Sequence, residues 1–150
     1  MKKEKINNSL ILAIDPGTEQ SGYVLFDADN KMVCQRGIVP NDEMLNLIAI
    51  TDGICVVVEM IASYGMAVGK DTFETCVWIG RFVQTAINGG LEYQLVYRKD
   101  VKMFLCGTMK AKDTNIRQAL IDLLGKDVTK GISKHMWAAL AIAVTVSRTE

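Results

Sequence analysis

The sequence predicts an α/β protein in which a single five-stranded mixed sheet is flanked by helices. Short apolar segments of strand length alternate with longer segments of helical periodicity, in the order β-β-β-α-β-α-β-α-α. Residues 54–60 are apolar and largely β-branched on both faces, as in a central strand covered on both sides. The 150 residues contain no repeat, low-complexity segment or linker, so one domain over residues 1–150 is expected.

The first half of the chain predicts three strands and a helix. An apolar run at 10–14 closes at the turn signal Asp15-Pro16-Gly17, and strands at 22–27 and 32–39 flank a turn at Asp29-Asn30. The segment 42–50 carries apolar residues at helical spacing, with Gly53 just beyond it.

The second half predicts two strands and three helices. After the strand at 54–60, Asp71 or Thr72 caps a helix that runs to Ile87 and ends at Gly89-Gly90. A fifth strand at 93–97 precedes a basic stretch, and helices follow at 114–124 and 136–146.

Composition excludes several classes of protein. No apolar run approaches the roughly 18 residues of a membrane span, and the basic residues 1–5 do not begin a signal peptide, so a cytoplasmic protein is expected. The cysteines at 34, 55, 76 and 106 form no Cys-x-x-Cys pair, which favours buried reduced thiols. Because the formal net charge is zero, any DNA-binding surface must be local.

Two carboxylates follow directly on predicted apolar strands. Asp15 and Glu59 converge at the carboxyl edge of the sheet if their strands are neighbours. Like charges that close need a cation between them, and oxygen ligands without a thiolate or histidine cluster favour Mg²⁺. The competing interpretation is an ordinary Asp-Pro-Gly turn at Asp15 and a charge emerging into solvent at Glu59.

Several motifs resemble one known family over nearly the whole chain. The run 11–18 with Ser21-Gly22-Tyr23, and later Val57-Val58-Glu59, resemble the two acidic motifs of RuvC-type Holliday junction resolvases, particularly short bacterial or bacteriophage forms. Residues 102–112 look like that family's basic DNA-binding segment, and 139–143 like its last helix. The resemblance implies a ribonuclease H-like fold and a crossover junction endodeoxyribonuclease of DNA recombination and repair, in a bacterial cell or phage-infected host.

The last helix carries the main departure from the family pattern. The family places two further metal-site residues three positions apart there, so that both share one helical face. His135 occupies the first position, which some members fill with histidine, and Ala138 occupies the second, where aspartate is expected. A methyl group cannot coordinate Mg²⁺. Either the carboxylate was lost naturally or Ala138 is an engineered substitution, which the otherwise intact motifs favour.

The mechanism implied by the resemblance is phosphodiester hydrolysis with two Mg²⁺ ions, Mn²⁺ being a possible substitute, ~4 Å apart. Asp15 would bridge both ions and Glu59 would hold the second. His135 would hold the first ion or relay a proton, with aspartate at 138 completing the set; an ordinary histidine near a helix start is the competing interpretation of His135.

A local basic surface follows the fifth strand. The segment 98–117 contains six basic residues against Asp100 and Asp113, a local excess of four positive charges. They are Arg98, Lys99, Lys102, Lys110, Lys112 and Arg117. Their place near the carboxylate edge favours DNA contact over an ordinary solvated face. Tyr64 is a candidate for stacking on an unpaired DNA base, with core packing as the alternative.

The long helix through Ile87 carries more apolar surface than one sheet face covers, which favours a two-fold homodimer. The resemblance implies the same, because a four-way junction needs two symmetric cuts. Trp78 and Phe82 are candidate interface anchors, with ordinary core packing as the alternative.

Two other functions remain open. Ala138 favours a non-catalytic junction-binding protein of the same fold. Asp-x-Gly-Thr followed by glycine also opens the phosphate loop of actin-like and sugar kinases, but those proteins need two such domains around the nucleotide and 150 residues fit one.

Overall fold

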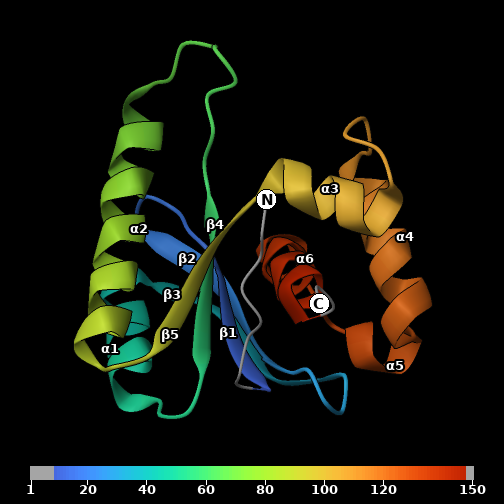
Figure 1. Ribbon diagram of the computed structural model, residues 1–150, viewed down its shortest axis with the longest axis horizontal. Helices are drawn as coiled ribbons and strands as arrows, with labels where there is room; N and C mark the ends of the chain where they lie inside the picture. The colour runs from blue at the N-terminus through green and yellow to red at the C-terminus, as the bar shows by residue number, and fades with distance from the viewer. Residues whose placement is uncertain (1–8, 148–150) are drawn as a thin grey trace.

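The computed structural model describes residues 9–147 as a five-stranded sheet with helices on both faces (Figure 1). The basic residues 1–5 lie outside these residues, as do the two ends of the predicted domain. The strands are β1 (Leu10–Asp15), β2 (Gln20–Asp27), β3 (Met32–Pro40), β4 (Cys55–Met60) and β5 (Glu92–Tyr97). The helices are α1 (Asn41–Ile50), α2 (Lys70–Asn88), α3 (Arg98–Cys106), α4 (Asp113–Leu124), α5 (Lys126–Thr129) and α6 (Lys134–Ser147). The predicted fold class is confirmed.

The sheet order places β1 at the centre and β4 beside it. The order is β3-β2-β1-β4-β5, with β1, β4 and β5 parallel and the β1–β2 and β2–β3 pairs antiparallel. Ile14 is opposite Val58 in the β1–β4 register, so Asp15 and Glu59 leave neighbouring strands at the same level. The carboxyl ends of the three parallel strands therefore share one edge of the sheet.

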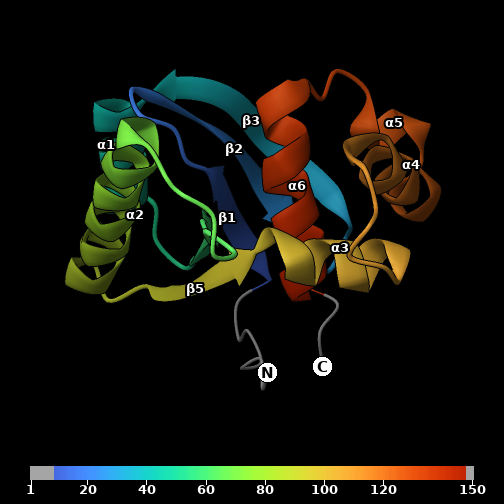
Figure 2. The same ribbon diagram turned by 90° about the horizontal axis from the view of Figure 1, so that it is seen from above.

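Helices cover the two faces of the sheet separately (Figure 2). Alternate residues of β1 point to opposite faces: Ile11 and Ala13 pack with α6, whereas Leu12 and Ile14 pack with α1 and α2. Residues 139–146 of α6 are all buried, because their small and apolar side chains let the helix lie close against β1 and β2. This docking brings the first turn of α6 to the carboxyl edge.

Three sequence predictions were wrong in detail. The basic stretch after β5 is helix α3, because Val101 is buried against the core and Asp100 lies in the first turn, near the positive end of the helix. Helix α2 begins at Lys70 with Gly69 as its N-cap, and neither Asp71 nor Thr72 caps it. A further short helix, α5, separates α4 from α6.

The thiols differ from the prediction as well. Among the four cysteines, which are all free, Cys55 is buried and Cys34 is exposed on the edge strand β3. Burial, followed by the charge of Glu92, raises the pKa of Cys55 to about 12, so that thiol stays protonated. Across residues 9–147, no helix combines the length and apolar character needed to span a membrane.

Candidate active site

A cavity of about 370 Å³ opens where the carboxyl edge of the sheet meets α3, α4 and α6. We call it the carboxylate cavity. It is lined by Asp15, Glu59, Arg98, Val101, Asp113, Ile116, Arg117, Lys134, His135, Trp137, Ala138, Ala141 and Ile142. The four residues that sequence reasoning proposed as catalytic, at positions 15, 59, 135 and 138, all face this one space.

The turn after Asp15 is fixed by a buried polar network. The Ser21 hydroxyl donates to Asn41 Oδ1 at 2.6 Å, and the Asn41 amide donates to the Gly17 carbonyl at 2.9 Å. The Gly17 N–H in turn donates to Ser21 Oγ at 3.2 Å. Gly17 is required there, because a Cβ would lie 2.3 Å from the carbonyl oxygen of Gln20. The backbone that follows Asp15 at the end of β1 is therefore held in one conformation.

Glu59 lies deeper in the cavity wall, one residue before the end of β4. Its side chain is 15% exposed, and its Oε1 lies 3.7 Å from Nη1 of Arg98. Burial, followed by the negative charge of Asp15, raises the pKa of Glu59 to about 7, although Arg98 opposes this rise. The two carboxylates thus leave an excess of negative potential that a cation would relieve.

His135 lies in the first turn of α6 and contacts Asp15. Its Nδ1 is 3.1 Å from Asp15 Oδ2, within hydrogen-bond distance. Burial raises the pKa of Asp15, and the hydrogen bond and charge of His135 counteract the rise. Gly22 makes this approach possible, because a Cβ on that β2 residue would lie 2.8 Å from the His135 Cβ. The glycine of the Ser21-Gly22-Tyr23 motif therefore serves the docking of α6.

Ala138 follows His135 by three residues and shares its helical face toward the cavity. Its methyl group is half-buried and offers no ligand atom. Within residues 9–147, no three histidine, cysteine, aspartate or glutamate side chains are grouped closely enough to hold a metal ion. Two carboxylates suit a hard divalent cation, and position 138 lacks the oxygen donor that would extend the set.

Sequence reasoning missed the partners of Glu59. Arg98 was expected only to contact DNA, yet its guanidinium reaches Glu59 and hydrogen-bonds Asp113 through Nη2. Asp113, the first residue of α4, was counted only as an offset to the basic charge. A prediction of α3 would have indicated both, since a helix starting directly at the end of β5 places its first residue at the carboxyl edge.

The basic segment contributes to a second, smaller pocket of about 220 Å³, lined by Tyr64, Arg98, Lys99, Lys102 and Met109. We call it the Tyr64 pocket. Tyr64 is 60% exposed, which excludes the alternative of core packing and leaves base stacking as the prediction. It lies in the loop between β4 and α2, next to Gly65, and both residues have positive φ.

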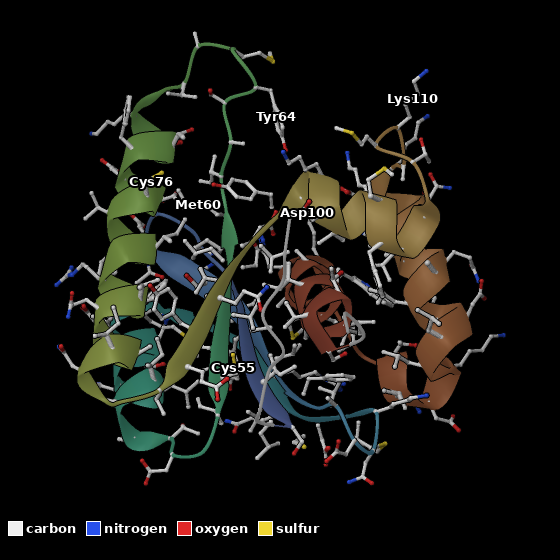
Figure 3. All side chains as sticks on the ribbon, in the orientation of Figure 1. Cys55, Met60, Tyr64, Cys76, Asp100 and Lys110 are labelled. Atoms are coloured by element: carbon white, nitrogen blue, oxygen red, sulfur yellow. The ribbon has the colours of Figure 1, made fainter. Side chains whose placement is uncertain are left out.

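Two of the predicted DNA-binding lysines lie elsewhere. Lys110 is exposed in the connection between α3 and α4, and Figure 3 shows it projecting away from Tyr64. Lys112 is the exposed N-cap residue of α4. Neither lines the carboxylate cavity or the Tyr64 pocket.

Comparison with known proteins defines the fold. No protein-family model matches the sequence, and no curated protein is significantly similar to it. Among solved structures, Thermus thermophilus RuvC superposes with a TM-score of 0.74 at 18% sequence identity, covering 91% of this chain and 92% of that chain. This chain has a RuvC-type fold.

A second structure agrees with the first. T. thermophilus RuvC in complex with a Holliday junction substrate superposes with a TM-score of 0.69 at 17% identity, with the same coverage of both chains. The expected resemblance to RuvC is confirmed at the level of fold. The RuvC-type fold of this chain carries its carboxylate cavity at the edge where β1 and β4 end.

Proposed function

We propose that this chain binds four-way and related branched DNA and is built to hydrolyse its phosphodiester bonds with divalent cations at the carboxylate cavity. The observation that carries the proposal is the meeting of Asp15, Glu59, His135 and position 138 around one cavity. The RuvC-type fold supports the choice of substrate, because a structural neighbour was solved with a Holliday junction.

The residues present fit at least a first divalent ion. Asp15 and Glu59 would hold it. Their negative charges repel each other in the buried site, and the ion would neutralise them. Bound Mg²⁺ or Mn²⁺ would activate a water molecule and stabilise the charge developing on the phosphate. The side chain of His135 is 57% exposed and its Nδ1 contacts Asp15, so its other ring nitrogen could accept a proton from the attacking water or coordinate the other ion.

Ala138 limits this chemistry. The two-ion arrangement expected of the site needs an oxygen donor where the Ala138 methyl faces the cavity. Junction binding without cleavage is therefore the second candidate function, and Ala138 is the observation that favours it. Binding and cleavage must be measured separately.

Binding selectivity tests the substrate. A mobility-shift titration should show a four-way junction bound at least about tenfold more tightly than a duplex of the same strands, in EDTA and in Ca²⁺. The Tyr64 pocket and the basic residues of α3 provide the local positive surface for this contact. Equal affinity for the junction and the duplex would contradict branched-DNA recognition.

The lysines of the Tyr64 pocket should set the salt dependence of binding. Lys99→Gln with Lys102→Gln should weaken junction binding roughly tenfold at moderate salt. The slope of log K against log salt should become shallower by about 2, as expected for the loss of two phosphate contacts. The control is Lys31→Gln with Lys126→Gln, which removes the same charge at the opposite end of the sheet and at α5. An equal loss in both double variants would show that net charge, and not this pocket, governs binding.

A homodimer is proposed through the outer face of α2. The exposed residues on this face recur at intervals of four and three, the spacing of a helix-pairing seam. They are Phe73, Val77, Gly80, Gln84 and Ile87. Phe82, predicted as an anchor, is fully buried and belongs to the core, and Trp78 packs partly against it. Gly80 has open space around its Cα, which permits close approach of a second helix.

Val77→Glu should therefore convert a dimer to a monomer in sedimentation velocity, because it places a charge in the apolar seam. Val77 is 63% exposed, so its replacement should leave the fold of the protomer intact. Ile50→Glu, at a 77% exposed residue on α1, is the matched control and should stay dimeric. A monomeric unmodified protein, or a dimeric Val77→Glu protein, would contradict this interface.

A further inference from the structure

Among residues 9–147, Arg98 is the one residue that lines both the carboxylate cavity and the Tyr64 pocket. It is the first residue of α3, directly after β5, and its side chain is 39% exposed. A long cationic side chain at this boundary can direct its guanidinium toward either space. Its ion-pair partners on the cavity side are Glu59 and Asp113, and Asp15 lines the same cavity without a direct ion pair to Arg98.

The two carboxylates hold Arg98 differently. Nη2 of Arg98 donates a hydrogen bond to Asp113, which anchors the guanidinium at the start of α4. Nη1 lies 3.7 Å from Glu59 Oε1, an ion-pair distance that is longer than a normal N–H···O hydrogen bond. Asp113 therefore holds the guanidinium in place, and Glu59 forms a looser ion pair with it.

We propose that Arg98 is a positioning residue that acts as a displaceable counter-ion: it neutralises Glu59 until a divalent cation takes that carboxylate, with Asp113 setting how strongly it does so. The inference rests on the proposed metal-dependent function. A divalent ion held by Asp15 and Glu59 would repel a guanidinium only 3.7 Å from Glu59. The adjoining Tyr64 pocket gives the displaced guanidinium a place beside Lys99 and Lys102, where a DNA phosphate would compensate the three positive charges.

Mn²⁺ binding to the protein without DNA tests the proposal, measured by calorimetry or by the loss of the free-ion electron paramagnetic resonance signal. Arg98→Gln should tighten Mn²⁺ binding by about threefold to tenfold, because it removes the competing cation. Asp113→Asn should weaken Mn²⁺ binding, since Arg98 then has Glu59 as its remaining partner among these carboxylates. In the double variant, Asp113→Asn should have little further effect, because its influence passes through Arg98.

The matched control is Lys112→Gln, which removes a positive charge from the exposed residue next to Asp113. It should leave the Mn²⁺ affinity within about twofold of the unmodified protein, since Lys112 does not line the cavity. Equal tightening by Lys112→Gln and Arg98→Gln, or strictly additive effects in the double variant, would overturn the proposal and leave the metal site standing. Absence of Mn²⁺ binding in every variant would overturn the metal site itself and this inference with it.

Discussion

Replacing Ala138 with aspartate will give this chain Mg²⁺- or Mn²⁺-dependent nicking of a four-way junction, at a rate at least about 100-fold above that of the unmodified protein. The reason is geometric. Position 138 faces the carboxylate cavity one helical turn after His135, so an aspartate there adds an oxygen donor to the cavity that Asp15 and Glu59 line. A 100-fold gain corresponds to about 2.7 kcal/mol of transition-state stabilisation, a modest share of what a completed metal site provides.

Ala138→Asn is the matched control, because it has nearly the shape of aspartate without the charge. It should bind the junction as the aspartate variant does and cleave it far more slowly. Products are resolved on denaturing gels, with the label placed on each strand in turn to establish whether cuts are symmetric. If Ala138→Asp binds junctions and gives no nicks with either ion, the non-catalytic junction-binding function is the correct one.

Replacing Glu59 with glutamine will stabilise the metal-free protein above neutral pH and abolish its stabilisation by divalent cations. The glutamate pKa rises from 4.5 to about 7 on folding, so the folded chain holds this proton more tightly than the unfolded chain does. The free energy of unfolding therefore falls as pH rises from about 4.5 to 7, and the full loss persists above that range. Glutamine cannot ionise and escapes the loss.

The expected gain at pH 8 is on the order of 3 kcal/mol, or roughly 6–12 °C in melting temperature, and it should vanish near pH 4. Glu59 is only 15% exposed, so solvent screening reduces this figure little. Added Mn²⁺ should reverse the order of stability at pH 8, because it binds the glutamate protein and not the glutamine variant.

Thermal melts at pH 4, 6 and 8, in EDTA and in excess Mn²⁺, measure both effects. Glu43→Gln, at an exposed position of α1, is the control and should change neither. If the melting temperature of Glu59→Gln has the same pH dependence as that of the unmodified protein, the raised pKa of Glu59 is contradicted. An equal response of both proteins to Mn²⁺ would contradict Glu59 as a ligand.

The strand ends of this site were predictable from sequence, and its cross-element contacts were not. Asp15 and Glu59 stand out because each follows a continuous apolar run, which fixes the end of a buried strand. The contact between Asp15 and His135 joins residues 120 positions apart, and only the docking of α6 against Gly22 brings them together. The family resemblance supplied His135, because local periodicity gives no sign of that contact.

The errors on α3 and α2 have different physical causes. The three basic residues of 98–102 suggested an open, solvent-exposed stretch, because most runs of charged residues are solvated. The stretch is helix α3, whose Val101 is buried in the core. On α2 the excess of apolar residues was correctly recognised. The choice of Phe82 as an anchor failed, because spacing alone cannot tell which of two apolar stripes faces the sheet.

The Ser21–Asn41–Gly17 network implies an uneven distribution of order within the site. Both side chains of the network are 1% exposed, so their hydrogen bonds form as the chain folds and the turn after Asp15 loses its conformational freedom then. The half of the site on β1 is thus preorganised, whereas in the other half the 57% exposed side chain of His135 keeps more of its rotameric freedom. DNA association would have to order only this second half, which lowers the entropy cost of forming the complex.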